Sequence, residues 1–321
     1  MRTERKGSGV MPKHTARFAV ALGLLMALVA LVATEASGTF AGANGRIAFT
    51  MRTETGDFDI YTMQPDGTGV VQVTTDPGRD FNPRWSPDGT RIAFSSNRDG
   101  DFDIWVANAD GSNPVQVVDT DGGVGEFVPT WTSDGLQIVF QRFFPTESAE
   151  IWIANSDGSG AEMKLADGFV PGTSAQGRKV VYTARSDNSL HVLNLEDGST
   201  RKVTSATGLD AEPNWSPTGN DLVFSRAVTP DAFFDTYVMH ANGKQPIQLT
   251  NTASALQEGS PVWSPDGSRI AVAICDFTSG VQGNCSIATM RPDGTDLTPI
   301  AIQGELFRVG GRIDWQAAPG G

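Results

Sequence analysis

A seven-residue phrase, Pro-x-Trp-Ser-Pro-Asp-Gly, recurs along this chain and limits what the chain can fold into. Its tryptophan position is occupied, in chain order, by Trp85, Trp131, Thr173 (in a degraded copy), Trp215, Trp263 and Trp315. Successive copies lie 42 to 52 residues apart. This spacing is typical of the blades of a β-propeller and fits no helical solenoid as well. We expect the tryptophans to pack between neighbouring sheets.

Each copy is followed by signals for further strands. After Trp85, the Ser-Pro-Asp-Gly turn leads to an alternating segment at 91–94, then to 103–106, and an Asp-Gly turn leads to 115–118. Proline presets φ in such turns, and glycine accepts the positive φ that closes a hairpin. Period-two alternation with a turn about every 8–12 residues indicates an all-β protein. No segment after residue 43 has convincing helical periodicity.

The two ends of the repeat region complement each other. Residues 46–50 form a second strand with no tryptophan strand before it, whereas 312–316 form a tryptophan strand with nothing after it. Joining them would complete one sheet and remove its exposed edge. We therefore predict an all-β fold over residues 44–316, a six-bladed β-propeller of four-stranded antiparallel blades, closed by the C-terminal strand joining the N-terminal blade. Residues 317–321 would be a tail.

The residues at 83–111 resemble the PD40 repeat, a WD40-like unit of the TolB-type six-bladed propellers. The resemblance rests on Pro-x-Trp-Ser-Pro-Asp-Gly-x-x-Ile-Ala-Phe, followed by Arg-Asp-Gly, Asp-Ile-Trp and Asp-Gly. It covers about residues 44–316 and fades in the fourth and sixth copies. It implies a propeller, export and binding of a partner. Similar blades occur in prolyl-peptidase-type enzymes, which also need a hydrolase domain that we do not expect here.

The first 43 residues have the pattern of a secretory signal peptide. Basic residues precede an apolar run at 18–33, and small residues follow at 41–43, where a signal peptidase could cut. An uncleaved N-terminal anchor is the alternative. We expect an exported protein that is secreted, periplasmic or on the cell surface, with membrane contact only through an uncleaved N-terminal segment.

Charge limits the class of partner. The chain has 24 Lys and Arg against 37 Asp and Glu, a net charge of −13. Such a chain repels phosphate backbones, so we expect no nucleic-acid partner. A basic protein or peptide is the expected partner, and we expect a monomer.

Two cysteines, Cys275 and Cys285, flank a polar, Gly-containing loop. In an oxidising compartment they are expected to form a disulfide across the base of a hairpin. Two free buried thiols are the alternative interpretation.

An acidic residue lies three positions before the motif proline in four copies: Asp80, Glu126, Asp210 and Glu258. The other two copies have Gly168 and Gly310 there. Since the entry to the innermost strand lies at one mouth of a propeller channel, these acids could form a partial ring that binds a cation or a basic peptide. Alternatively, each acid caps its own loop or pairs with a neighbouring blade.

A second pattern places Arg at the end of strand two and an acid at the start of strand three. It occurs as Arg52/Asp59, Arg98/Asp103, Arg142/Glu150 and Arg226/Asp235. Because a binding site occupies one place and not four, we interpret these as structural ion pairs within hairpins or between blades.

Two aromatic pairs fall outside the repeat pattern. Phe143-Phe144 and Phe233-Phe234 lie in long loops between strands two and three. Exposed loop aromatics are credible anchors for a partner, and local packing is the alternative.

Little in the sequence points to catalysis. There is no Gly-x-Ser-x-Gly elbow and no phosphate-binding loop, and the three histidines are isolated from one another. Asp99, Asp101 and Asp103 open like an EF-hand loop, but Ile104 stands where that loop needs Gly. We predict no enzyme activity, no metal site and no cofactor, with adventitious Ca²⁺ left open.

The sequence thus favours an exported, non-catalytic propeller scaffold. It would bind a protein or peptide at the acidic channel mouth or at the long loops. Two alternatives stay open: a metal-dependent hydrolase or lyase acting on saccharides or lactones in the channel, and a cell-surface glycan-binding module.

Overall fold

The structure is a computed structural model, and it describes residues 41–319 apart from 54–55, 121, 147, 175–176, 206–207, 230–231, 252–255, 277–283 and 303–308. The chain divides into two units, Met1–Ala36 and Ser37–Gly321. The first unit, and with it nearly all of the predicted leader at 1–43, lies outside the described residues. Within the described part, no helix has the length and apolar character needed to cross a membrane.

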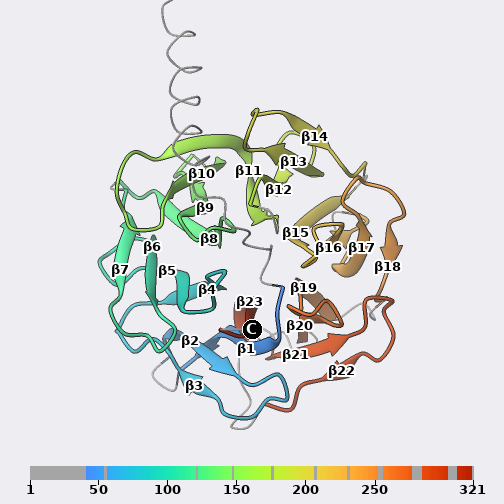
Figure 1. The fold of residues 1–321 in the computed structure, drawn as a ribbon, viewed down its shortest axis with the longest axis horizontal. Coiled ribbons are helices and arrows are strands. Elements are labelled where there is room, and N and C mark those ends of the chain that lie inside the picture. The colour runs from blue at the N-terminus through green and yellow to red at the C-terminus, as the bar shows by residue number, and fades with distance from the viewer. Residues whose placement is uncertain are drawn as a thin grey trace, which may run out of the picture. The chain divides into compact units, whose positions relative to one another are not determined.

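The described residues of the second unit form antiparallel sheets arranged as a β-propeller (Figure 1). The first sheet contains β23 (Val309–Ala317), β1 (Asn44–Arg52), β2 (Phe58–Met63) and β3 (Val71–Gln72). The second contains β4 (Asp80–Trp85), β5 (Arg91–Ser96), β6 (Asp103–Asn108) and β7 (Val115–Val118).

A seven-stranded sheet comes next along the chain, with β8 (Gly125–Trp131), β9 (Gln137–Phe143), β10 (Ala149–Asn155), β11 (Met163–Thr173), β12 (Lys179–Ala184), β13 (Leu190–Asn194) and β14 (Thr200–Lys202). Two four-stranded sheets follow. One has β15 (Leu209–Trp215), β16 (Asp221–Ala227), β17 (Asp235–His240) and β18 (Ile247–Gln248). The other has β19 (Leu256–Trp263), β20 (Ile270–Asp276), β21 (Asn284–Met290) and β22 (Thr298–Pro299).

The all-β propeller is confirmed, but the prediction of six separate four-stranded blades is wrong for residues 125–202. The described residues form four such blades and one seven-stranded sheet. The cause is β11, which pairs with β10 through residues 163–167 and with β12 through 168–173. Elsewhere the last strand of one sheet and the first strand of the next are separate elements, such as β7, which ends at Val118, and β8, which begins at Gly125. No residue intervenes between Asp167 and Gly168, so one strand serves both neighbours.

The predicted closure between the two ends of the repeat region is confirmed. β23 pairs antiparallel with β1, with Ile47 opposite Trp315 and Phe49 opposite Ile313. The tryptophan-bearing segment is therefore the innermost strand of the sheet that contains β1. In Figure 1, β4, β8, β15, β19 and β23 lie nearest the centre, and β3, β7, β14, β18 and β22 lie at the rim.

The core lies between neighbouring sheets and is organised by the tryptophans. Trp85 of β4 packs with Ala48 and Ile60 of the preceding sheet and with Phe94 of its own sheet. Trp131 is fully buried, and its indole Nε1 donates to the backbone oxygen of Arg84 in the preceding sheet, at 3.0 Å. The expectation that the tryptophans pack between sheets is confirmed.

The Ser-Pro-Asp-Gly turns close on themselves through side-chain bonds. Ser86 Oγ donates to Asp88 Oδ1 at 2.6 Å and accepts from the Arg91 amide at 2.9 Å. Gly89 has φ of +67°, and a Cβ there would lie 2.4 Å from the backbone oxygen of Ala317. The glycine is therefore required both by the turn and by the close approach of β23.

Candidate functional site

We call one end of the sheets the hairpin face. It consists of the hairpins from the second to the third strand, such as 97–102, and of the segments that lead into the innermost strands, such as 73–79. Consecutive turns of an antiparallel sheet lie at opposite ends, so the Ser-Pro-Asp-Gly turns lie at the other end. All site residues predicted from the sequence fall on the hairpin face or directly beneath it.

Each innermost strand is interrupted by a β-bulge close to this face. The pairing of β4 with β5 shifts between Phe81 and Arg84, and Asn82 there has φ of +56°. Equivalent residues with positive φ are Val128, Val170, Glu212 and Ser260. A bulge bends its strand and re-aims the side chains around it. The acids before the bulge are thereby set apart from the tryptophans after it.

The four predicted ring acids lie on the innermost strands, but none is accessible. Asp80, Glu126, Asp210 and Glu258 are each 0% exposed. Burial is the main influence on the pKa of Asp80, Glu126 and Glu258 and raises all three. As placed, these carboxylates do not form an open ring at the channel mouth, and any binding role remains a prediction.

Arginines hold three of the four acids in place. Arg98 Nη2 lies 3.2 Å from Asp80, Arg142 Nε lies 2.7 Å from Glu126, and Arg226 Nε lies 2.6 Å from Asp210. Glu258 instead accepts from the hydroxyls of Thr236, at 2.9 Å, and Thr250. Three of the four charges are thus compensated inside the protein, by arginines of the acid's own blade and not by a neighbouring blade as the structural alternative had it.

The predicted ion pairs within hairpins are wrong in their partners. Arg226 stands in register between Asp210 on one side and Asp235 on the other, and it bonds Asp210. Arg142 bonds Glu126 and Glu162 in place of Glu150, and Arg98 bonds Asp80 and Asp76 in place of Asp103. Arg52 donates to the backbone oxygen of Gly56. The innermost acid takes the arginine because an uncompensated charge costs most where burial is deepest.

The third-strand acids have another partner, which the sequence interpretation missed. Asp59, Asp103 and Asp235 accept from the side-chain amides of Gln72, Gln116 and Gln248, at 2.7, 3.1 and 2.9 Å. Each glutamine follows its aspartate by 13 residues. That constant spacing was a signal that could have revealed these pairs.

Two of these aspartates share a sheet boundary with a buried acid. Burial, with the nearby Asp80 charge, raises the pKa of Asp59 to about 6. Burial, together with a hydrogen bond to Glu126, raises the pKa of Asp103 to about 8. At this second boundary the negative charge of Glu126 also contributes to raising the pKa of Asp103, because two neighbouring carboxylates disfavour each other's ionised form.

The predicted anchor aromatics lie on the hairpin face. Phe143 ends β9 and is 41% exposed, and Phe233, between β16 and β17, is 38% exposed. Their neighbours Phe144 and Phe234 are half-buried. Two rings are therefore accessible on this face, as exposed anchors would be.

The predicted disulfide is present in the β20–β21 hairpin. Cys275 and Cys285 stand opposite each other in register, with an Sγ–Sγ distance of 1.99 Å. The loop that they enclose, 277–283, lies outside the described residues.

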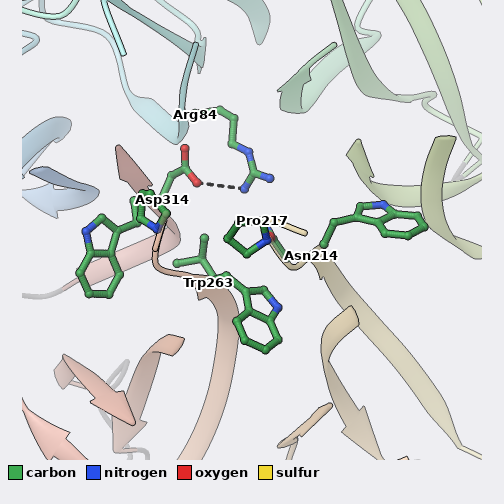
Figure 2. A pocket seen from close by; sticks show the side chains of 9 residues that line it. Arg84, Asn214, Pro217, Trp263 and Asp314 are labelled. Carbon is green, nitrogen blue, oxygen red and sulfur yellow. Dashed lines mark ion pairs between the residues drawn. The ribbon is translucent and has the colours of Figure 1, made fainter. Parts of the chain in front are cut away.

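A small pocket lies on the inner side of β4, β15, β19 and β23 (Figure 2). Arg84 and Asp314 point toward each other there, with Arg84 Nη1 at 3.2 Å from Asp314 Oδ1. Asp314 Oδ2 also accepts from the Trp85 amide at 2.8 Å. Burial raises the pKa of Asp314, and the Arg84 charge opposes that shift. The cavity offers only about 10 Å³, which is room for about one water molecule and far less than a small-molecule site needs.

The described residues contain no group of three or more His, Cys, Asp or Glu side chains arranged to hold a metal ion. Asp99 and Asp103 are bridged by the side-chain amide of Gln116, at 2.6 and 3.1 Å. Adventitious Ca²⁺ binding and the absence of enzyme activity both remain predictions.

A family model described as the TolB beta propeller domain, PD40, matches residues 29–189 and 147–310. A protein TolB homolog of Chlorobium luteolum is 50% identical over 56 residues, which are 17% of this chain and 13% of that protein. The uncharacterized peptidase YuxL of Bacillus subtilis is 27% identical over 192 residues, which are 56% of this chain and 27% of that protein. The matches thus span well under half of these relatives.

Solved structures share the fold at low sequence identity. TolB from Acinetobacter baumannii has a TM-score of 0.69 at 19% identity, over 94% of this chain and 71% of that one. A chain of the nidogen/laminin complex has a TM-score of 0.63 at 13% identity, over 85% and 99%. An oligogalacturonate lyase from Vibrio parahaemolyticus has a TM-score of 0.52 at 14% identity, over 82% and 74%.

Proposed function

Because the chain belongs to the PD40 family of TolB β-propeller domains, we propose that it is an exported, non-catalytic scaffold that binds a partner protein or peptide on its hairpin face. The observation that carries this proposal is the exposure of Phe143 and Phe233 on two hairpins of that face. Exposed rings on loops held by a rigid scaffold are typical of protein-binding surfaces.

The burial of the four acids moves the proposed site away from an acidic channel mouth. Asp80, Glu126 and Asp210 are already paired with arginines, so a basic partner would have to break these pairs to reach them. The loops carry apolar and acidic groups that a partner can contact without breaking these ion pairs. The partner is therefore expected to engage the loops.

Export is supported by two features. The basic and apolar pattern of the first 43 residues is that of a secretory signal. The disulfide between Cys275 and Cys285 fits an oxidising compartment, because cytosolic thiols are kept reduced.

Protein binding is also in keeping with one structural relative, since the nidogen chain of similar fold was solved in complex with laminin. No observation on the described residues favours the hydrolase or lyase alternative or the glycan-binding alternative over this one. Both remain predictions from the sequence.

The test is affinity capture with the mature protein from its own envelope and medium fractions, followed by titration of the purified partner. Replacing Phe143 and Phe233 together by Ser should weaken that partner's binding by about tenfold or more, since buried aromatic anchors carry much of the energy of an interface. Leu136→Ser is the matched control, because Leu136 is 63% exposed but lies in the β8–β9 turn at the opposite end. Equal loss in both variants would contradict a site on the hairpin face.

A further inference from the structure

Four phenylalanines form a continuous row of rings on the hairpin face, which we call the phenylalanine ladder. It contains Phe58, Phe81, Phe102 and Phe127, each partly exposed. Ring centroids are 5.0 Å apart between Phe58 and Phe81, 5.9 Å between Phe81 and Phe102, and 4.9 Å between Phe102 and Phe127. The rings come from β2, β4, the hairpin before β6, and β8, so the ladder crosses two sheet boundaries.

A glycine in the backbone leaves space for the last ring of this row. At Gly125, a Cβ would lie 2.7 Å from the ring of Phe127, and the Cβ of Phe102 is 3.7 Å away. The Glu126 amide donates to the backbone oxygen of Phe102 at 2.6 Å, which fixes the two segments side by side. A side chain at position 125 would therefore push the last ring of the ladder away.

Among the residues that the structure describes, the same positions at other sheet boundaries lack such a row, although the backbone is alike. The Glu258 amide donates to the oxygen of Phe234 at 3.3 Å, as Glu126 does to Phe102. The residue after Glu258, however, is Gly259, where Phe127 follows Glu126. At the boundary between the sheet that ends with β14 and the sheet that begins with β15, the Asp210 amide donates to the backbone oxygen of Asn188 at 3.0 Å. A ring that only held sheets together would recur at each boundary, so the ladder indicates a role specific to this sector.

Carboxylates outnumber arginines in the segments that lead to the ladder. The described residues of 52–57, 73–79, 97–102 and 119–124 carry five aspartates, Asp57, Asp76, Asp99, Asp101 and Asp119, against three arginines, Arg52, Arg79 and Arg98. Arg98 is already bonded to Asp76 and Asp80. The excess of negative charge around partly exposed rings suits a ligand that is both apolar and cationic, because cations are attracted to carboxylates and to ring faces alike.

We propose that the phenylalanine ladder docks an extended segment of a partner protein in which Arg or Lys alternates with apolar or aromatic residues. This rests on the proposed protein-binding function and names the residues and the partner chemistry. The apolar side chains would pack on the tilted rings, and the cations would lie over ring faces and beside Asp99 and Asp101. The segment would run along the face from the first sheet toward β8.

The test uses the full chain and a short fluorescein-labelled peptide in which Arg alternates with Trp and Leu, titrated by fluorescence anisotropy. Phe81→Ala and Phe102→Ala should each weaken binding by about tenfold or more, and added salt should weaken binding to the wild type. Phe169→Ala is the matched control. It removes a partly exposed ring of β11, at the position that corresponds to Phe81 of β4 and Phe127 of β8 but outside the ladder, so peptide affinity should be unchanged.

Phe102→Leu keeps most of the apolar volume, so it is a second variant in case the alanine variants misfold. The far-UV circular dichroism spectrum of each variant should match that of the wild type. A probe with Glu in place of Arg should bind at least tenfold more weakly. Equal affinity for the two probes, equal loss in Phe169→Ala, or binding only of a neutral oligosaccharide would overturn the proposal. If the natural partner is captured but ignores ladder substitutions, the proposed function stands and this inference fails.

Discussion

Arg98, Arg142 and Arg226 each join a buried acid to an aromatic ring. The guanidinium of Arg142 lies 4.4 Å from the ring centroid of Trp152, while its nitrogens bond Glu126 and Glu162. Arg98 lies 4.6 Å from Trp105 in the same way. Each arginine therefore supplies charge, hydrogen bonds and packing at once.

Replacing Arg142 by Ala should lower the free energy of unfolding by about 3–5 kcal/mol, because it leaves the Glu126 carboxylate buried without its cation. Urea denaturation at neutral pH measures this loss. Arg178→Ala is the control: its pair with Glu196 is exposed, and such pairs contribute only about 0–1 kcal/mol. Similar losses of unfolding free energy in the two variants would show that the buried pair stabilises the fold no more than the exposed pair does.

The Asp103–Glu126 pair predicts a pH dependence of stability. The pKa of Asp103 is about 8 in the folded chain but about 4 when unfolded. Between these values the folded state binds more protons, so this group's contribution to stability is complete below about pH 4 and falls until about pH 8. Relative to Asp103→Asn, the wild type should lose stability across this window.

Urea unfolding at several pH values from 4 to 9 gives this difference. Asp110→Asn is a control, since hydrogen bonds from Ser112 lower the pKa of the exposed Asp110. Its difference from the wild type should be flat above about pH 5, because both folded and unfolded states are then ionised. A constant difference in stability between the wild type and Asp103→Asn at every pH would contradict the raised pKa of Asp103.

The noncovalent partners of individual side chains could not be predicted from the sequence. Arg226 is in register with Asp210 and Asp235 together, and the sequence pattern selected the wrong one. Choosing between them needs the burial of each acid, which depends on the sheet packed against it. The ladder was missed for the same reason, because Phe58, Phe81, Phe102 and Phe127 meet only across sheet boundaries.

At the scale of elements, local signals were sufficient for most strands. The segments predicted at 91–94, 103–106 and 115–118 lie within β5, β6 and β7. Alternation and turn chemistry act between residues close in sequence, so they can be read without knowing the fold. β11 is the exception, because its continuity depends on pairing with β10 and β12 simultaneously.

The β20–β21 hairpin carries its own prediction. Replacing Cys275 and Cys285 together by Ser should lower the free energy of unfolding by about 2–3 kcal/mol, because the unfolded chain regains the freedom that a closed loop of about ten residues removes. Chemical denaturation with and without reductant measures it. The reduced wild type should match the double variant, and an unchanged free energy in the variant would show that the crosslink does not stabilise the fold.

At the scale of the whole molecule, the pairing of β1 with β23 joins residues near the two ends of the repeat region. Ile47, Phe49, Ile313 and Trp315 share one buried cluster there. The innermost strand of the first sheet thus comes from the far end of the repeats, and the first sheet is complete only when the last strand has been added.

Deleting residues 309–321 should abolish cooperative unfolding and cause aggregation, because it exposes the edge of β1 and opens the cluster around Trp315. Size-exclusion chromatography and thermal circular dichroism would detect both changes. Deleting only residues 319–321 is the control, since these residues follow β23. A shortened chain that stays monomeric and unfolds cooperatively would contradict the role assigned to closure.

The amino-acid sequence by itself determined the all-β class, the repeating strands, the disulfide partners and the joining of the two ends. These follow from periodicity, turn residues and the count of strands, all of which are local or arithmetic. Only the tertiary structure decided that the four acids are buried, which partner each acid takes, that β11 is shared and that four phenylalanines form one row. These depend on which side chains face each other across neighbouring sheets, and on how much water each loses there.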